Sequence, residues 1–128
     1  MACGVSYRST QPIEKAMSVP TEAKARKNLP IVRGVLDYFP GALLAVAEVS
    51  RVGNDQHNPG QPLHWAKEKS TDEADALLRH LIDRGKLDTD GLRHSAKVAW
   101  RALALLQREI DAEGQTDLAF QKAYSVQT

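Results

Sequence analysis

The sequence predicts an all-α protein, a compact bundle of three to five helices. Three stretches carry apolar residues at the three- and four-residue spacing of a helix, and Gly or Pro residues separate these stretches. Aromatic residues make up only 5% of the chain, so the predicted core consists mostly of Leu, Ala and Val, which suit close contact between helices. The 128 residues are enough for one domain, and the short connection between the last two helices favours antiparallel packing.

The chain divides by composition into three parts. Residues 1–28 are expected to form an irregular N-terminal arm, because prolines and glycines recur there with one helical turn at most over 13–17. Residues 29–114 are predicted to form the helical core domain. Residues 115–128 are expected to form a C-terminal tail, in which residues 117–124 fit a further helix.

Before the core, two short segments have mixed signals. Residues 21–27 fit a short helix that Pro30 ends, since the residue before a proline avoids the helical region. Residues 31–39 fit either a short helix or an extended segment. Pro40 then stands where prolines favour the first turn, and residues 42–55 follow as the first long helix.

Two further helices follow a long loop over residues 53–69. Ser70 and Glu73 have the spacing of a capping box, which predicts a helix from there to Arg84 with Gly85 as its stop. The last long helix is predicted over residues 92–112, ending near Gly114. The predicted buried face of the helix after the loop consists of Ala74, Leu77, Leu78, Leu81 and Ile82.

Charge and cysteine content exclude several function classes. Seventeen basic and sixteen acidic residues leave a formal charge of +1, so DNA or RNA is not an expected partner, although a local cationic pocket for a small anion is compatible with this balance. The single cysteine, Cys3, allows neither an intramolecular disulfide nor a thiolate zinc cluster. No apolar run approaches ~20 residues and the start lacks a hydrophobic signal segment. We therefore expect a soluble, cytoplasmic protein without a membrane partner.

Carboxylates in two places are candidate metal ligands. Magnesium prefers hard oxygen ligands, as a magnesium–phosphate site requires. Glu48 is unusual because it lies within a small, apolar run on the first long helix, and Asp88 and Asp90 occupy the turn before the last helix. We take Glu48, Asp88 and Asp90 as candidate metal ligands. The alternative for each acid is an ordinary solvated or paired surface residue.

A second group of candidate ligand-binding residues is cationic. Arginine binds phosphate oxygens with a two-pronged guanidinium, and lysine acts as a compact charge. Three arginine, lysine or histidine residues share one face of the last helix. Two more lie on the preceding helix, which we expect to be antiparallel to the last helix. These residues are His94, Lys97 and Arg101, with Arg79 and His80. The alternatives are a solvated basic face and buried imidazoles bonded to backbone carbonyls.

The long loop contributes a third group. His57, His64 and Trp65 can stack on or hydrogen-bond to a nucleobase. Trp65 fits equally well as a lid over the core. The four histidines lack the spacing of common metal motifs and give only weak evidence for zinc or iron.

Four segments together resemble a known family. They are Phe39 to Ala47, Gly53 to Trp65, Arg79-His80-Leu81, and Asp88 to Leu103. In order and spacing, residues 29–112 resemble the N-terminal domain family of phage dATP/dGTP diphosphohydrolases, which is similar to the all-α MazG and HisE pyrophosphohydrolases. The resemblance implies a helical bundle, usually oligomeric, that cleaves nucleoside triphosphates between the α and β phosphates with magnesium held by helix carboxylates.

This sequence matches the family pattern at some positions and departs from it at others, and both bear on its function. The positions that match are Gly53, Trp65, Arg79, His80, Asp88, Asp90, Gly91 and His94. The chain departs at Gln56-His57-Asn58, where relatives tend to carry Lys-Tyr-Gly, at Lys86, where relatives often carry an acid, and in having no ExxE pair. The resemblance therefore supports nucleotide binding better than hydrolysis.

Three functions remain open. The first is a phage-type nucleotide pyrophosphohydrolase that converts a dNTP to a dNMP and pyrophosphate, with magnesium as its cofactor. The second is a non-catalytic binder, a sponge that sequesters a nucleotide signal of host immunity in the host cytoplasm and needs no metal. The third is a structural or interaction module. A phosphorylated nucleotide is the expected partner in the first two, and a homo-oligomer is expected because the core of one chain is small.

Overall fold

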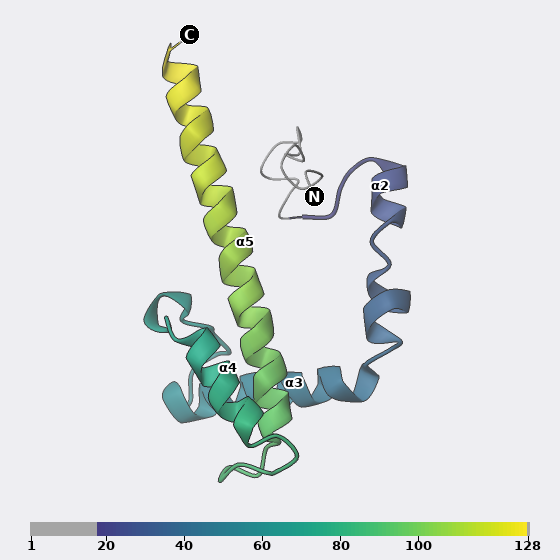
Figure 1. Ribbon diagram of the computed structural model, residues 1–128, viewed down its shortest axis with the longest axis vertical. Helices are drawn as coiled ribbons and strands as arrows, with labels where there is room; N and C mark the ends of the chain where they lie inside the picture. The colour runs from purple at the N-terminus through teal and green to yellow at the C-terminus, as the bar shows by residue number, and fades with distance from the viewer. Residues whose placement is uncertain (1–17, 128) are drawn as a thin grey trace. The chain divides into compact units, whose positions relative to one another are not determined.

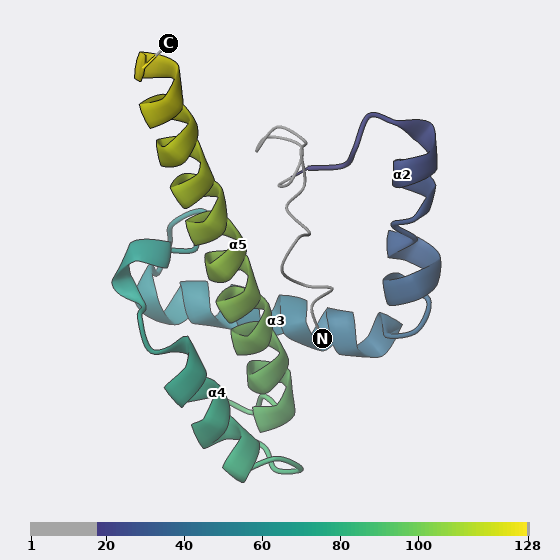
Figure 2. The same ribbon diagram turned by 45° about the horizontal axis from the view of Figure 1, so that its top comes forward.

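The computed structural model describes the backbone of residues 18–127 and the side chains of residues 18–114. Over this range it contains four α-helices and no strand: α2 (Ala23–Lys27), α3 (Pro40–His57), α4 (Glu73–Ile82) and α5 (His94–Gln127). A π-helical turn, η2, spans Val32–Leu36, and a 3-10 turn, η3, spans Lys67–Lys69. Figures 1 and 2 show these elements from two directions. The predicted all-α class is confirmed.

The Cα positions divide the chain into two units. One unit is Pro30–Glu109, and the other consists of the segments Met1–Leu29 and Ile110–Thr128. The predicted helical turn over 13–17 and Cys3 lie outside the described residues. The description below concerns the unit Pro30–Glu109, which holds α3, α4 and the first part of α5.

Helix α3 begins at the proline that the sequence singles out. Pro40 occupies the first helical turn, where its missing N–H is not needed, and the helix runs two residues past the predicted end at residue 55. Near its end, Asn54 is buried and holds the following loop. Its side chain donates to the carbonyl of Gln61 at 3.1 Å and accepts from the backbone N–H of His64 at 3.2 Å. The long loop is therefore folded back onto the end of α3.

The predicted capping box at the start of α4 is wrong. Asp72 is the residue before the first helical turn, and its side chain makes no capping hydrogen bond. Instead, the Ser70 hydroxyl donates to the Glu73 carboxylate, side chain to side chain. The carboxylate of Glu73 is turned inward toward α5, so it is not available to reach back to the backbone. The helix ends at Ile82 rather than Arg84, and Gly85 follows with a positive φ of 84°.

Helices α4 and α5 are antiparallel, as predicted. Glu73 at the start of α4 binds Arg101 of α5, with Arg101 Nη1 3.0 Å from Glu73 Oε1. His80 near the end of α4 faces His94 at the start of α5, with the two Nδ1 atoms 2.9 Å apart. From Glu73 to His80 the residue number rises by seven, whereas the number of the contacting residue on α5 falls by seven, from Arg101 to His94. This is the pattern of an antiparallel pair. The two helices also lie side by side in both views (Figures 1 and 2).

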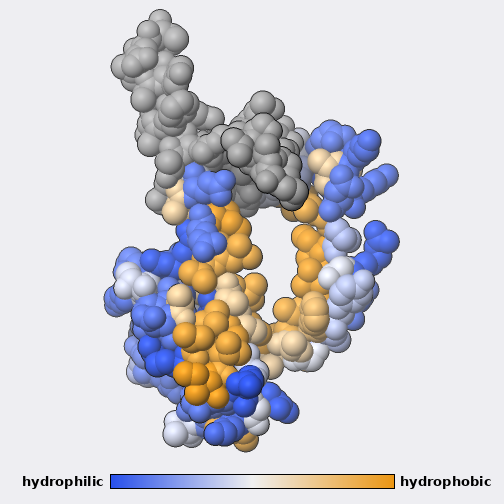
Figure 3. All heavy atoms as spheres, viewed as in Figure 1, coloured by the Kyte–Doolittle hydropathy of each residue, from blue (hydrophilic) through white to orange (hydrophobic). Residues whose placement is uncertain are grey.

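The buried face predicted for α4 is also wrong. Leu78 and Ile82 are 57% and 70% exposed, and only Glu73 and Ala76 of α4 are buried. Among the described residues, the buried hydrophobic ones are small apart from one leucine: Ala76, Leu92, Ala96 and Ala104. Figure 3 shows uncovered hydrophobic atoms over α4 and the first part of α5. The buried apolar positions of α4 and α5 are thus alanines, and larger apolar side chains remain at the surface.

Helix α5 continues past its predicted end. Gly114 does not stop it, and the helix extends to Gln127. Among the described glycines, only Gly60, Gly85 and Gly91 have a positive φ, so Gly114 does not adopt the left-handed conformation that ends helices. A glycine inside a helix costs about 1 kcal/mol relative to alanine, which does not by itself end a helix.

No single helix among the described residues has the length and apolar composition needed to cross a membrane. A bent pair of helical segments, Ala23–Leu36 with Pro40–His57, passes this test when both are taken together, on length and composition alone.

Glu73 is the residue on which the pairing of α4 and α5 depends. Its side chain is 3% exposed and also lies against Arg108, with Arg108 Nε 3.5 Å from Glu73 Oε2. We expect Glu73→Ala to lower the free energy of unfolding by about 3 kcal/mol, because two arginines lose their buried counter-charge. Urea denaturation measures this. Asp75→Ala, on the exposed side of the same helix, is the matched control with an expected loss of about 0.5 kcal/mol. Equal losses in the two variants would contradict the assignment.

Candidate functional site

The turn between α4 and α5 positions the acidic residues of the site. Gly85 and Gly91 have φ angles of 84° and 81°, which only glycine adopts without strain. An antiparallel bridge joins Leu87 to Arg93, and the backbone N–H of Asp88 donates to the carbonyl of Leu92 at 2.7 Å. The segment therefore closes into a small loop that presents Asp88 and Asp90 toward α5.

Lys97 of α5 lies between these two carboxylates. Its Nζ is 2.6 Å from Asp88 Oδ2 and 2.7 Å from Asp90 Oδ2. The side chains of Lys97 and Asp90 are each 16% exposed, so solvent screens the three charges only partly. Each remaining carboxylate oxygen accepts from the backbone, Asp88 Oδ1 from Thr89 N at 2.7 Å and Asp90 Oδ1 from Leu92 N at 3.1 Å. Lys97 thus fixes the turn to the first part of α5.

The charges of this group are strongly coupled. The hydrogen bond from Lys97 lowers the pKa of Asp88 to about 2, and the same donor lowers the pKa of Asp90. Burial alone would lower the pKa of Lys97, but the hydrogen bonds to Asp88 and Asp90 outweigh burial and raise it. All three groups are therefore charged at neutral pH.

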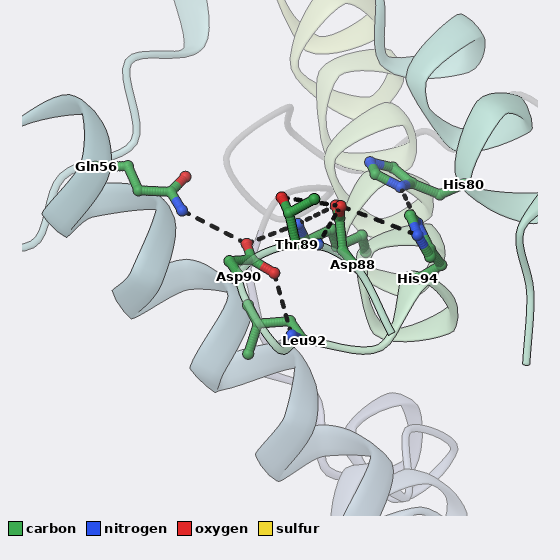
Figure 4. A network of polar contacts seen from close by, with 8 residues as sticks. Gln56, His80, Asp88, Thr89, Asp90, Leu92 and His94 are labelled. Carbon is green, nitrogen blue, oxygen red and sulfur yellow. Dashed lines mark hydrogen bonds and ion pairs between the residues drawn. The ribbon is translucent and has the colours of Figure 1, made fainter. Parts of the chain in front are cut away.

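Two histidines lie beside the acidic turn. His80 of α4 and His94 of α5 face each other through their Nδ1 atoms, with ring centroids 5.1 Å apart. His94 Nε2 lies 4.0 Å from Asp88 Oδ1, so His94 stands between His80 and Asp88 (Figure 4). Burial lowers the pKa of His80, and the charge of Lys97 adds to this effect. A neutral His80 can offer a nitrogen lone pair to a neighbouring group.

Helix α3 reaches the same turn from the other side. Gln56 Nε2 lies 3.5 Å from Asp90 Oδ2, and Figure 4 shows the Gln56 side chain extending from α3 toward Asp90. Three separate parts of the chain therefore converge on Asp90: the end of α3, the turn before α5 and, through Lys97, α5 itself.

A cavity of about 560 Å³ opens between these elements. Its volume falls within the roughly 300–1,000 Å³ range of small-molecule sites. The end of α3, the loop after it, α4 and α5 all contribute to its wall. The lining residues are Val49, Ser50, Val52, Gly53, Asn54, Gln56, His57, Asn58, His64, Trp65, Ala66, Lys69, Ser70, Asp72, His80, Asp90, Leu92, Lys97, Trp100 and Arg101.

Two tryptophans form the aromatic part of this wall. Trp65 of the loop and Trp100 of α5 meet edge to face, with ring centroids 5.5 Å apart. The Lys67 ammonium lies 5.0 Å from the centroid of Trp65, and the Arg101 guanidinium carbon lies 5.6 Å from that of Trp100. Trp65 therefore packs against another aromatic side chain and also borders the cavity. A role as a lid over the core and a role in contacting a ligand are compatible with this position.

The structure brings most of the predicted site residues together. Those that line the cavity are His57, His64, Trp65, His80, Lys97 and Arg101, together with Asp90. His94 and Asp88 do not line it but contact residues that do. Arg79 does not line it either: its side chain is 64% exposed and pairs at 3.3 Å with Asp72, which does line the cavity. Whether these residues bind a ligand stays a prediction.

The predicted magnesium ligands do not fit one ion. Glu48 is exposed and does not line the cavity, and it precedes Gln56, the α3 residue nearest Asp90, by eight residues, or about 12 Å along a helix. The Lys97 ammonium already stands between the facing oxygens of Asp88 and Asp90, where a bridging cation would bind. Glu48, Asp88 and Asp90 are therefore not arranged around a single magnesium ion.

Several residues important for the site were missed from the sequence. Trp100 follows Lys97 by three positions, a helical spacing that could have assigned it to the same face. Asn54 and Glu73 gave no such signal, because a buried polar residue among ordinary surface residues is recognisable only once its partners are known. The mutual approach of His80 and His94 likewise depends on the register of two helices.

Comparison with known proteins gives one result. A family model described as dATP/dGTP diphosphohydrolase, N-terminal, matches residues 20–118. This match contains the whole of the cavity wall and the range 29–112 over which the resemblance is seen in the sequence. No curated protein and no solved structure matches the chain.

Substituting Lys97 tests the electrostatics of the site. We expect Lys97→Met to lower the free energy of unfolding at neutral pH by about 2 kcal/mol, less than for a fully buried pair because the group is partly solvated. The pKa of Asp88 is about 2 in the folded protein against an ordinary 3.8, so its stabilising contribution is present above pH 3.8 and is lost as the pH falls toward 2. The difference between wild type and variant should therefore shrink over that window.

Urea denaturation at pH values from 7 to about 2.5 measures this difference. Lys86→Met is the matched control, because Lys86 is an exposed lysine of the same turn. A Lys97→Met effect that stays constant across the acid range would show that Lys97 acts through packing rather than through its charge.

Proposed function

Because the chain belongs to the family of dATP/dGTP diphosphohydrolase N-terminal domains, we propose that it binds a purine deoxynucleoside triphosphate in the cavity between α3, α4 and α5. The observation that carries the proposal is that the cavity wall has an aromatic part and a separate polar part. Two tryptophans form one part, and a polar group of His80, Lys97 and Asp90 forms another.

The aromatic part of the wall is suited to a nucleobase. Trp65 and Trp100 offer a large apolar surface, and base–aromatic stacking contributes about 1–3 kcal/mol per base. His57 and His64 border the same space and can hydrogen-bond to base edges. We therefore place the base against Trp65.

The polar part is suited to phosphates, although two of its cations are already paired with carboxylates. Lys97 is neutralised by two carboxylates, and Arg101 is bound to the buried Glu73. Lys69 and His80 also line the cavity. A triphosphate would therefore contact the ammonium of Lys69 and hydrogen-bond to His80, while the group of Arg101, Arg108 and Glu73 contributes a longer-range positive potential.

Family membership favours hydrolysis between the α and β phosphates, giving a dNMP and pyrophosphate, with a metal ion as cofactor. Magnesium is the ion expected for such an enzyme, to offset the triphosphate charge. The carboxylates predicted to hold it, Glu48, Asp88 and Asp90, are not arranged around one ion.

The position of Lys97 favours a second candidate, a protein that binds a nucleotide without cleaving it. With its ammonium between Asp88 and Asp90, this region has a built-in cation in place of an exchangeable metal. A phage-encoded sponge that sequesters a nucleotide signal of host immunity would need this kind of binding without turnover.

We also propose that the protein is a homo-oligomer. The buried hydrophobic residues of the described chain are few and, apart from Leu92, small, whereas Leu78, Ile82, Leu103 and Leu106 are all at least half exposed on α4 and α5. Exposed apolar surface of this kind is a common feature of subunit interfaces.

Isothermal titration with dGTP and dATP, with and without magnesium, tests nucleotide binding. We expect Trp65→Ala to weaken binding about tenfold or more, from the loss of base stacking. Tyr38→Ala is the matched control, since Tyr38 is an aromatic residue that is 72% exposed and lies outside the cavity wall. Absence of binding to either nucleotide would refute the proposal and favour a structural module.

Measurement of pyrophosphate release in the same samples separates the two candidate functions. Metal-dependent release of pyrophosphate would establish the enzyme. Binding that survives EDTA, with the nucleotide recovered unchanged, would establish the binder.

Light scattering during size-exclusion chromatography tests the oligomer. We expect a mass that is a multiple of 14.1 kDa. Ile82→Glu, at a 70% exposed position, should shift it toward the monomer, because an interface does not tolerate an unpaired charge. A wild-type mass of one chain would contradict this part of the proposal.

A further inference from the structure

The side chains of His80, His94 and Asp88 converge on one point beside the cavity. One ligand atom from each lies within 4.8 Å of the other two. The three residues come from different places in the chain: α4, the start of α5 and the turn between them (Figure 4). We propose that these three residues bind a divalent transition-metal ion, of which Zn²⁺ is the clearest example.

The donor atoms select the kind of metal. Imidazole nitrogen suits zinc and other late first-row ions, whereas magnesium prefers an all-oxygen octahedron and retains water. Two histidines and one carboxylate form a three-ligand set that leaves a fourth position open, as in catalytic zinc sites. His80 lines the cavity, so the open position of such an ion would be close to a bound molecule.

The observed distances are near those of a metal site. Metal bonds of about 2.0–2.2 Å place the ligand atoms of a tetrahedral ion about 3.3–3.6 Å apart. One ligand atom from each of the three residues lies within 4.8 Å of the other two, so shifts of about 1 Å would suffice here. His94 faces His80 through Nδ1, 2.9 Å from His80 Nδ1, and faces Asp88 through Nε2, 4.0 Å from Asp88 Oδ1. Only one of these two nitrogens can bind the ion, so the His94 ring would turn on binding. The side chains of His94 and Asp88 are 13% and 23% exposed, which leaves them partly shielded and yet reachable.

Neighbouring groups already orient the carboxylate. Lys97 holds Asp88 Oδ2, and Thr89 N donates to Asp88 Oδ1, the oxygen nearer to His94. Hydrogen bonds of this kind to a ligating carboxylate commonly fix its direction in metal sites. With neutral imidazoles, the carboxylates of Asp88 and Asp90 and the ammonium of Lys97 sum to one negative charge, which favours a cation.

The proposal is independent of nucleotide binding, so it is tested with the metal alone. The full chain is freed of metal with a chelator, dialysed and titrated with Zn²⁺ by calorimetry. We expect one ion per chain and a rise in Tm with Zn²⁺ concentration, because the ion stabilises only the folded state. Magnesium at the same concentrations should produce neither effect.

Variants identify the ligands. His80→Ala and His94→Ala should each weaken Zn²⁺ binding by about 100-fold or more, since even residues outside the ligand set often cost 10–100-fold. His57→Ala is the matched control, an exposed histidine elsewhere on the cavity wall, and should bind Zn²⁺ as the wild type does. Equal losses in all three variants would overturn the proposal.

A measurement on the wild-type chain avoids reliance on folded variants. The imidazole nitrogen signals of the four histidines in NMR spectra report metal coordination directly. Zn²⁺ should shift the signals of His80 and His94 and leave those of His57 and His64 in place. Shifts confined to His57 and His64, or no binding of Zn²⁺ to the wild type, would overturn the proposal.

Discussion

The ammonium of Lys97 between Asp88 and Asp90 is the interaction on which the arrangement of this site depends. It joins the turn after α4 to α5 with two short ion pairs of 2.6 and 2.7 Å, in surroundings that exclude much of the solvent. It also determines the chemistry available there. With the facing carboxylate oxygens bound to a lysine, the acids cannot serve as an open magnesium site, and the remaining Oδ1 of Asp88 faces His94 instead.

The antiparallel contact of α4 and α5 is a second constraint, because it brings the histidines together. Glu73 holds Arg101 and Arg108 at one end of the pair, and His80 meets His94 at the other. The buried apolar residues of the two helices are Ala76, Ala96 and Ala104 rather than large side chains. A small-residue contact allows close approach but buries little apolar surface, so the buried ion pairs are important for the specificity of the pairing.

These constraints connect the proposals made above. A nucleotide in the cavity would lie between the tryptophans and His80, and a transition metal bound by His80, His94 and Asp88 would lie beside its phosphates. If both ligands bind, the metal would supply the positive charge that Lys97 and Arg101, already paired with carboxylates, cannot fully provide. The nucleotide and the metal are nevertheless separate claims, since either can bind without the other.

The sequence by itself determined the all-α class, the start of α3 at Pro40, the antiparallel order of α4 and α5 and the family, because periodicity, breakers and ordered motifs are local properties. It also picked out residues that line the cavity, among them Trp65, His80 and Lys97. The predictions from the sequence were wrong for the buried face of α4, for Ser70 as the cap of α4 and for Gly114 as the end of α5. Only the tertiary structure decided that Glu73 points inward, that Lys97 lies between Asp88 and Asp90 and that Arg79 pairs with Asp72 instead of lining the cavity. Each outcome depends on which distant charge lies within a few ångströms.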